Sequence, residues 1–188
     1  MPAAYRFPLQ LRFGDVDSYG HVNNVRFLQF LEDARVHWLR EPLRVPAQGA
    51  RTMADLVTAE NFTLVGRHEI EYLAPLLYRR EPVAVDLWVT RVGGSSFDLG
   101  YSVLDPEADA VCALCSTSMV LVSRGTGRPV RLPDGLRAEL AEFAGPDVPF
   151  RRRPPLPSQG TTAPPPPAFG GTRAAAAPGG TAATGATA

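Results

Sequence analysis

The sequence predicts an α+β domain in which one amphipathic helix packs against a five-stranded antiparallel sheet. Two periodicities predict this domain. Five segments place apolar residues at every second position, and a single long segment places them at helical spacing. A change of composition near residue 150 separates the domain, 1–150, from a tail, 151–188, that is rich in Pro, Ala and Gly.

The five segments with a period of two are predicted strands, because alternation puts one row of side chains against a core and the other in solvent. Gly93-Gly94 marks a hairpin turn between the third and fourth of them. A short helix is predicted after the last strand, over 134–143, with Asp134 as its N-cap. The predicted strands occupy residues 5–13, 68–72, 83–89, 97–103 and 111–122.

The segment 23–40 has helical periodicity instead. Phe27, Leu31 and Trp38 fall on one apolar stripe, and charged residues take much of the remaining surface. Pro42 cannot continue a helix and ends it. The spacing therefore predicts one long helix of about five turns that buries a broad face.

Charge is divided unevenly between the two parts of the chain. All 19 acidic residues lie in 1–150 together with 15 of the 19 arginines, so the domain carries −4 and the tail +4. An acidic domain argues against nucleic acid as a partner, and no apolar run reaches the roughly 18 residues of a membrane span. The first residues lack a signal-peptide pattern, so we expect a cytoplasmic protein. The tail has too few large apolar residues to offset the entropy of ordering, which predicts disorder.

The residues that carry chemistry lie between Gly14 and Asn24, where the first strand gives way to the helix. A helix N-terminus offers unpaired N–H groups and the positive end of the helix dipole, which stabilise a developing oxyanion. This junction also supplies the carboxylate of Asp17, the imidazole of His21 and two carboxamides, Asn23 and Asn24. The same residue types occur in ordinary turns and helix caps, so composition leaves both interpretations open.

Residues 17–27, DSYGHVNNVRF, resemble the D-x-x-x-H-V-N-N-x-x-[YF] signature of acyl-thioester hydrolases with the hotdog fold. Residues 14–17, GDVD, are similar to the same loop in the 4-hydroxybenzoyl-CoA thioesterase branch, and weaker similarity extends over about residues 5–140. The resemblance implies that the sheet wraps around one long central helix and that copies pair into a homodimer or homotetramer. It also implies hydrolysis of acyl-CoA or acyl-carrier-protein thioesters by water, with no metal and no organic cofactor.

Carried over by position, the resemblance assigns Asp17 as the active-site carboxylate and the backbone N–H of Asn24 as the group that polarises the thioester carbonyl. Asp17 acts either as a general base on water or as a nucleophile that forms an anhydride, and the sequence leaves both open. His21 matches a catalytic position of the plant acyl-carrier-protein branch, although that branch has Asn at the position of Tyr19.

Coenzyme A carries phosphates, which arginine binds well, and a pantetheine arm, which hydroxyl groups can hydrogen-bond. We therefore expect arginine and serine side chains near the thioester to bind the substrate. The candidate substrate-binding residues are Arg79, Arg80, Arg91, Ser95 and Ser96.

Two other features suggest chemistry. Cys112 and Cys115 form a C-x-x-C motif, but they lie inside a predicted strand without the further ligands of a zinc site. We predict neither a metal nor a redox function for them. Glu32 and Asp33 are reserve candidates for the catalytic carboxylate, because some hotdog thioesterases place that group on the helix.

Three functions compete. The first is an acyl-CoA thioesterase, and the second is a hotdog hydratase or dehydratase that acts on enoyl thioesters. Hotdog hydratases often carry Asp and His five positions apart, whereas Asp17 and His21 are four apart, which favours hydrolysis. The third is a non-catalytic domain that binds acyl thioesters.

Overall fold

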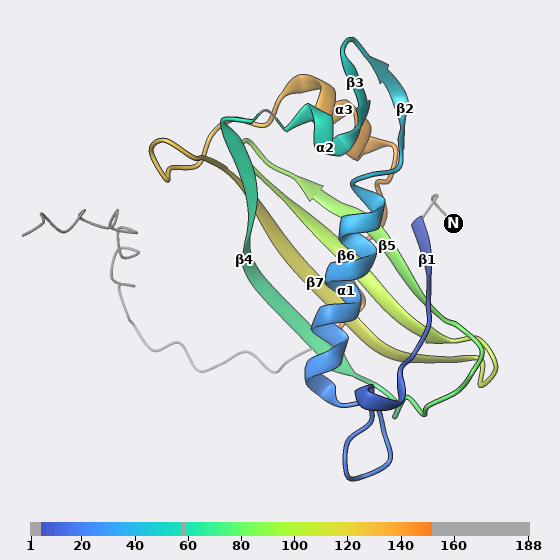
Figure 1. Cartoon of the computed structure of the whole chain (residues 1–188). Helices are drawn as coiled ribbons and strands as arrows, with labels where there is room; N and C mark the ends of the chain where they lie inside the picture. The colour runs from blue at the N-terminus through green and yellow to red at the C-terminus, as the bar shows by residue number, and fades with distance from the viewer. Residues whose placement is uncertain (1–4, 58, 152–188) are drawn as a thin grey trace, which may run out of the picture. The chain divides into compact units, whose positions relative to one another are not determined.

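The computed structural model describes residues 5–57 and 59–151, and its largest element is a five-stranded sheet (Figure 1). Its strands are β1 (Tyr5–Leu9), β4 (Asn61–Tyr72), β5 (Val83–Val92), β6 (Ser96–Asp105) and β7 (Ala110–Ser123). They follow the spatial order β1-β5-β6-β7-β4, and every neighbouring pair is antiparallel. The predicted five-stranded antiparallel sheet is confirmed, although β1 stops at Leu9 rather than at residue 13.

One face of the sheet is covered by α1 (Asn24–Trp38), which buries the predicted apolar stripe. Leu31 and Trp38 are fully buried in the core between helix and sheet. At 15 residues α1 is shorter than the predicted range 23–40. Asn23 stands outside the helix as its N-cap, and its side-chain oxygen accepts an N–H of the first turn at 3.0 Å.

Four smaller elements lie together at one end of the sheet (Figure 1). They are β2 (Pro42–Ala47), β3 (Ala50–Thr52), α2 (Met53–Leu56) and α3 (Asp134–Ala141). The sequence predicts only α3, and it places the end of that helix two residues late and its N-cap at Asp134 instead of Pro133. The hairpin of β2 and β3 was not predicted, because its first strand contains prolines at 42 and 46 and proline is unusual in strands.

A buried carboxylate joins this small group of elements together. Glu139 of α3 accepts the backbone N–H groups of Arg44 and Val45 in β2 at 2.7 to 3.0 Å. The Arg44 guanidinium in turn lies 3.8 Å from the centre of the Phe143 ring. The almost completely buried side chain of Glu139 therefore connects α3 to β2.

After α3 the chain crosses the face of the sheet that points away from α1. The indole N–H of Trp88 donates to the backbone oxygen of Pro146 at 2.7 Å. A Cβ atom on Gly100 would lie 2.4 Å from the Trp88 ring, so only glycine fits beneath it. Further along, Arg151 Nε lies 3.3 Å from the carboxylate of Glu71 in β4. Part of this outer face is thus covered by the chain itself.

The edge strand β4 is open on one side. It pairs only with β7, and it is the longer of the two edge strands. Leu64 and Val65 in it are 45% and 40% exposed. Among the described residues, no helix is both long enough and apolar enough to cross a membrane. Apart from Arg151, the predicted tail lies outside the described residues.

Candidate active site

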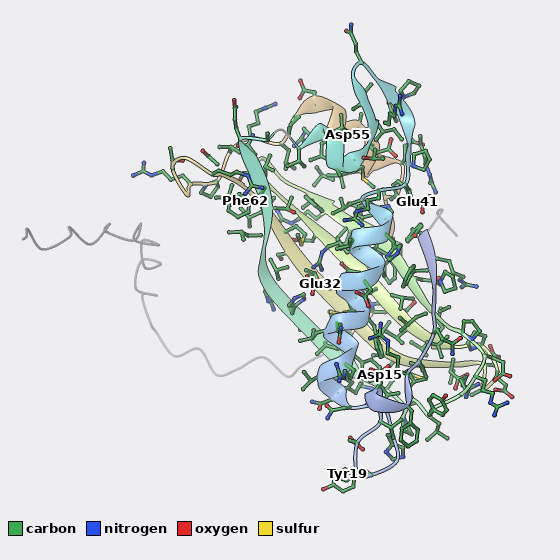
Figure 2. The ribbon with its side chains drawn as sticks, in the orientation of Figure 1. Asp15, Tyr19, Glu32, Glu41, Asp55 and Phe62 are labelled. Carbon is green, nitrogen blue, oxygen red and sulfur yellow. The ribbon has the colours of Figure 1, made fainter. Side chains whose placement is uncertain are left out.

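Asp15 fixes the loop that joins β1 to α1. It closes a short 3-10 turn, and its buried carboxylate accepts the N–H of Arg12 at 2.8 Å. Its backbone oxygen accepts the N–H of Asn23, also at 2.8 Å. Nε of Arg26, in the first turn of α1, lies 3.5 Å from the same carboxylate. Asp15, which lies beside the start of α1 (Figure 2), therefore connects both ends of the loop to the helix.

Within this loop, a tight turn sets the position of Asp17. Asp17 Oδ1 accepts the N–H of Tyr19 at 2.8 Å, and its backbone oxygen accepts the N–H of Gly20 at 3.1 Å. Gly20 has φ +82°, a left-handed conformation that glycine adopts without strain. The Asp17 N–H donates to the backbone oxygen of His21 at 2.9 Å. Tyr19 lies at the exposed tip of the turn (Figure 2).

The end of the loop next to α1 contacts the connection between β4 and β5. Val22 donates its N–H to the backbone oxygen of Leu76 at 2.8 Å, and His21 forms an isolated β-bridge with Leu77. These contacts bring residues about 55 positions apart in the sequence to one place. The connection thereby becomes one wall of the site.

The helix N-terminus at the site keeps a free donor. The N–H groups of Val25 and Arg26 are bonded to the side chain and backbone of Asn23. The N–H of Asn24 has no hydrogen-bond partner among the described residues. The hydroxyl of Tyr72 donates to the backbone oxygen of Asn24 at 2.9 Å. Burial raises the pKa of Tyr72, so its hydroxyl stays a donor at neutral pH.

These groups surround a pocket of about 380 Å³. The structure brings the three predicted catalytic residues, Asp17, His21 and Asn24, to its wall. The rings of Phe27 and Tyr72 meet edge to face at 5.3 Å and close one side. A carboxylate, an imidazole and a helix N-terminus therefore share one cavity with apolar walls. The lining residues are Asp17, His21, Val22, Asn24, Phe27 and 72–76.

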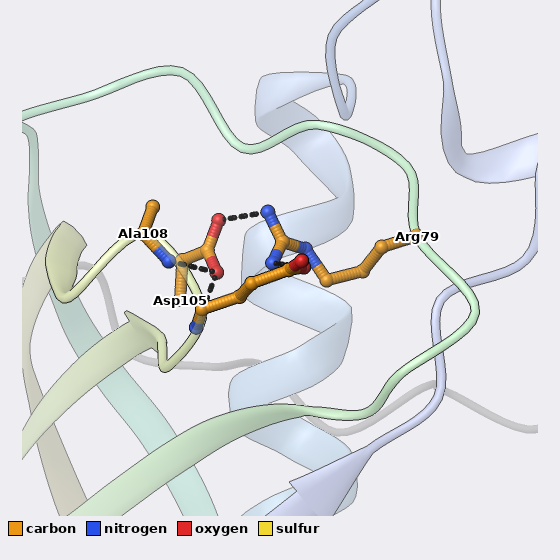
Figure 3. A network of polar contacts seen from close by, with 4 residues as sticks. Arg79, Asp105 and Ala108 are labelled. Carbon is orange, nitrogen blue, oxygen red and sulfur yellow. Dashed lines mark hydrogen bonds and ion pairs between the residues drawn. The ribbon is translucent and has the colours of Figure 1, made fainter.

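Arg79, a predicted substrate-binding residue, lies in a buried ion-pair network instead (Figure 3). Its guanidinium hydrogen-bonds the carboxylates of Asp105 and Glu107, and its side chain is only 13% exposed. Asp105 also accepts the N–H groups of Glu107 and Ala108 at 3.2 Å. Because two carboxylates already neutralise Arg79, it is not available for a phosphate.

The other predicted substrate-binding residues are divided between the two ends of the sheet. Arg80 is exposed at the pocket end, and no described residue pairs with its guanidinium. Arg91 pairs with Asp98 at 2.6 Å. Ser95 and Ser96 belong to the hairpin beside α3, at the opposite end from the loop of Asp17. A single chain thus brings only Arg80 near the pocket.

Two residues that shape the site, Asp15 and Tyr72, were not among the predicted site residues. Asp15 is part of the GDVD match, but nothing in the sequence shows that its carboxylate is buried. Tyr72 lies 48 residues from Asn24, so only the pairing of β4 with β7 brings it to the helix. The local signal for Tyr72 is its place at the end of a predicted strand.

The remaining candidates lie elsewhere. Glu32 and Asp33 are more than two turns along α1 from Asn24 and do not line the pocket. Cys112 and Cys115 are both buried free thiols, and burial raises the pKa of Cys115 to about 11. Among the described residues, no group of three or more His, Cys, Asp or Glu side chains is arranged to hold a metal ion.

Comparison with known proteins adds independent evidence. A family model described as the thioesterase-like superfamily matches residues 11–140. Bacillus subtilis YsmA, an uncharacterized protein, is 26% identical over 126 residues, which are 67% of this chain and 78% of YsmA. The PA5185 protein of Pseudomonas aeruginosa is 30% identical with a TM-score of 0.61, over 74% of this chain and 91% of that one. A Thermus thermophilus thioesterase, solved with coenzyme A and Zn, is 27% identical with a TM-score of 0.57, over 72% and 95%.

Proposed function

The chain belongs to the thioesterase-like superfamily and is a thioester hydrolase, and on this premise we propose that it hydrolyses acyl-CoA to a free carboxylic acid and CoA. One observation carries the proposal: the carboxylate of Asp17 and the unpaired N–H of Asn24 line the same pocket. The Thermus thioesterase holds coenzyme A, which supports CoA as the carrier of the acyl group.

In the proposed reaction the thioester carbonyl oxygen accepts the N–H of Asn24. Attack on the carbonyl carbon turns it tetrahedral, and negative charge gathers on that oxygen. A donor fixed at a helix N-terminus stabilises this charge more than it stabilises the ground state. By the scale of other oxyanion-hole donors, this N–H lowers the barrier by about 3 kcal/mol.

Asp17 supplies the carboxylate along either of two routes. As a general base it takes a proton from the water that attacks the carbonyl carbon. As a nucleophile it attacks that carbon itself, and water then hydrolyses the mixed anhydride. In both routes the thiolate of CoA leaves and takes up a proton. Incorporation of ¹⁸O into the Asp17 carboxylate during a single turnover in ¹⁸O-water would establish the anhydride route, because only hydrolysis of an anhydride can label that carboxylate.

We propose that His21 takes part in proton transfer at the same site. It lines the pocket, and its imidazole has no hydrogen-bond partner among the described residues. It is therefore free to hydrogen-bond the attacking water or the departing thiolate. Replacement of His21 by Gln, which keeps an amide donor, should lower kcat less than replacement by Ala.

We further propose that the enzyme is a homodimer paired along β4. An exposed edge strand is a template for pairing, and the outer face is already partly covered by residues after α3. Antiparallel pairing of two β4 strands would bring the hairpin end of one sheet beside the pocket end of the other. We propose that Ser95 and Ser96 of the second copy then contact the pantetheine arm of CoA, whereas Arg91 stays paired with Asp98. Sedimentation should give twice the chain mass of 20.2 kDa, and a stable monomer contradicts this pairing.

The activity is tested by thiol release from a panel of acyl-CoA substrates. Asp17→Asn should lower kcat at least about 100-fold, the low end for loss of a general base. Asp109→Asn is the matched control, because Asp109 is an exposed carboxylate whose φ of 48° asparagine also tolerates. Near wild-type activity of Asp17→Asn would remove that residue from the mechanism.

Two other results would replace the proposal. Faster hydration of enoyl-CoA than thiol release would identify a hydratase. Binding of acyl-CoA without any turnover would identify a non-catalytic acyl-thioester-binding domain.

A further inference from the structure

Large apolar side chains are exposed mainly at the end of the sheet where the pocket lies. Nine such side chains are exposed among the described residues. Six of them lie on the loop after β1, at the start of α1, at the end of β4 or on the connection that follows it: Phe13, Tyr19, Val25, Tyr72, Leu77 and Tyr78. Exposed apolar area concentrated at one place marks a binding surface.

Two of these rings form a pair. Phe13 is 81% exposed and Tyr78 is 44% exposed, and their rings meet edge to face with centroids 6.1 Å apart. Neither ring is needed to fill the core, because both present most or much of their surface to solvent. An exposed pair of aromatic rings offers a face on which a planar base can stack.

Two arginines lie close to this aromatic pair in the sequence. Arg12 precedes Phe13, and Arg80 follows Tyr78 by two residues. Gln10 donates a side-chain hydrogen bond to the backbone oxygen of Arg80 at 2.8 Å, which holds the two segments side by side. Neither guanidinium has a partner among the described residues. They differ in this from Arg79, which two carboxylates neutralise.

The aromatic pair is within reach of a ligand that enters the pocket. Leu76 lines the pocket, and four residues further along the chain is Arg80, at most about 14 Å away. The segment between them starts against the active-site loop, through the contacts of Leu76 with Val22 and of Leu77 with His21. A molecule with its thioester at Asn24 and an extended arm would pass over Leu77 toward Tyr78.

We propose that Phe13 and Tyr78 stack the adenine of CoA and that Arg12 and Arg80 bind its phosphates. The inference rests on the proposed thioesterase activity and deepens it. Nucleobases stack on aromatic rings, and one guanidinium group can donate two parallel hydrogen bonds to the oxygens of a phosphate. A carrier protein presents the same pantetheine arm without an adenine, so this surface makes the enzyme selective for CoA thioesters. A second copy is a poorer occupant, because an isologous contact would add four like charges to one interface.

The test combines binding with kinetics. Wild-type protein should bind adenosine 3′,5′-bisphosphate, the nucleotide end of CoA, in a calorimetric titration. Phe13→Ala should weaken this binding at least about fivefold, the low end for loss of one stacked ring, and Phe13→Trp should restore it. Arg80→Ala should weaken it as well, whereas Arg131→Ala, an exposed arginine away from the pocket, should not.

In steady-state assays Phe13→Ala should raise KM for an acyl-CoA at least about fivefold and leave kcat within twofold. With the same acyl group on pantetheine, KM should not change. An equal rise of KM for both substrates would overturn the proposal, and so would a wild-type protein that does not bind the bisphosphate. A variant that sediments at a lower mass than wild type would make the patch a contact between copies. If no thioester is hydrolysed by wild type, the thioesterase proposal fails while the titration still reports on nucleotide binding.

Discussion

The hydroxyl of Tyr72, at the end of an edge strand, donates a 2.9 Å hydrogen bond to the backbone oxygen of Asn24 in the first turn of α1. This bond joins the sheet to the helix end that lines the pocket through Asn24. Its donor stays protonated at neutral pH because burial raises the pKa of Tyr72. The position of the proposed oxyanion donor therefore depends on a strand 48 residues away.

Removal of this bond should lower kcat without changing the wall of the pocket. Tyr72→Phe keeps the edge-to-face contact with Phe27 and loses only the hydroxyl. A neutral hydrogen bond contributes about 1 kcal/mol, so kcat should fall about fivefold while KM stays near its wild-type value. Steady-state kinetics measure both constants. An unchanged kcat would mean that Tyr72 does not position the helix end.

Asp15 should matter for both stability and turnover. Asp15→Ala leaves the N–H of Arg12 without its acceptor and removes the ion-pair partner of Arg26. We expect a loss of about 2 kcal/mol in the free energy of unfolding and a fall in kcat of about tenfold or more, because the loop of Asp17 is no longer fixed. Asp15→Asn retains an acceptor oxygen, so it should lower the free energy of unfolding and kcat less than Asp15→Ala does. Equal effects of the two substitutions would refute this role.

Glu139 should stabilise the fold without affecting the chemistry. Its charged carboxylate accepts backbone N–H groups of β2 in a buried position, and hydrogen bonds to charged groups contribute about 2 kcal/mol. Urea unfolding of Glu139→Gln should show a loss of this size, with kcat unchanged at temperatures where the variant is folded. Glu142→Gln, three residues further on and exposed, is the control and should be neutral.

Replacement of Arg79 by Met should lower the stability of the fold, whereas the same replacement of Arg80 should leave stability nearly unchanged. Arg79→Met leaves the buried Asp105 carboxylate without its cation, which costs about 3 kcal/mol or more in the free energy of unfolding. Arg80→Met changes an exposed side chain and should cost less than about 0.5 kcal/mol. Its effect should appear in KM for acyl-CoA instead. Similar stability losses in both variants would contradict the assignment of Arg79 to an ion pair.

Stability should decline in alkaline solution. Burial raises the pKa of Cys115 from its ordinary value of 9.0 to about 11 and that of Tyr101 from 10.0 to about 12. The folded protein holds these protons more tightly than the unfolded chain. The resulting stabilisation is complete below pH 9 and is lost as the pH rises through 11 and 12.

Urea unfolding at pH 8 and at pH 10.5 measures this loss, and Cys115→Ala should show a smaller difference between the two pH values. An equal free energy of unfolding at both would contradict it. Both thiols should also resist a thiol reagent at pH 8 until the protein is unfolded, so thiol-release assays will report CoA alone.

Local patterns in the sequence were sufficient for the sheet and for part of the site. Period-two alternation locates the strands because burial of one face requires it, although β4 begins seven residues before its predicted start and β1 ends at Leu9. Asp17, His21 and Asn24 lie within eight positions, so one motif contains all three. The β2–β3 hairpin was not predicted because β2 contains two prolines and β3 has only three residues, too few to show alternation.

By itself the sequence determined which residue types stand ahead of α1, since a turn and a helix cap are encoded within a few neighbouring positions. Only the tertiary structure decided which of two adjacent arginines is available to a ligand. Asp105 lies 26 residues from Arg79 along the chain, at the end of β6, and the fold places its carboxylate against that guanidinium. Such pairing depends on how distant strands are placed, a long-range property that no short segment of the chain records.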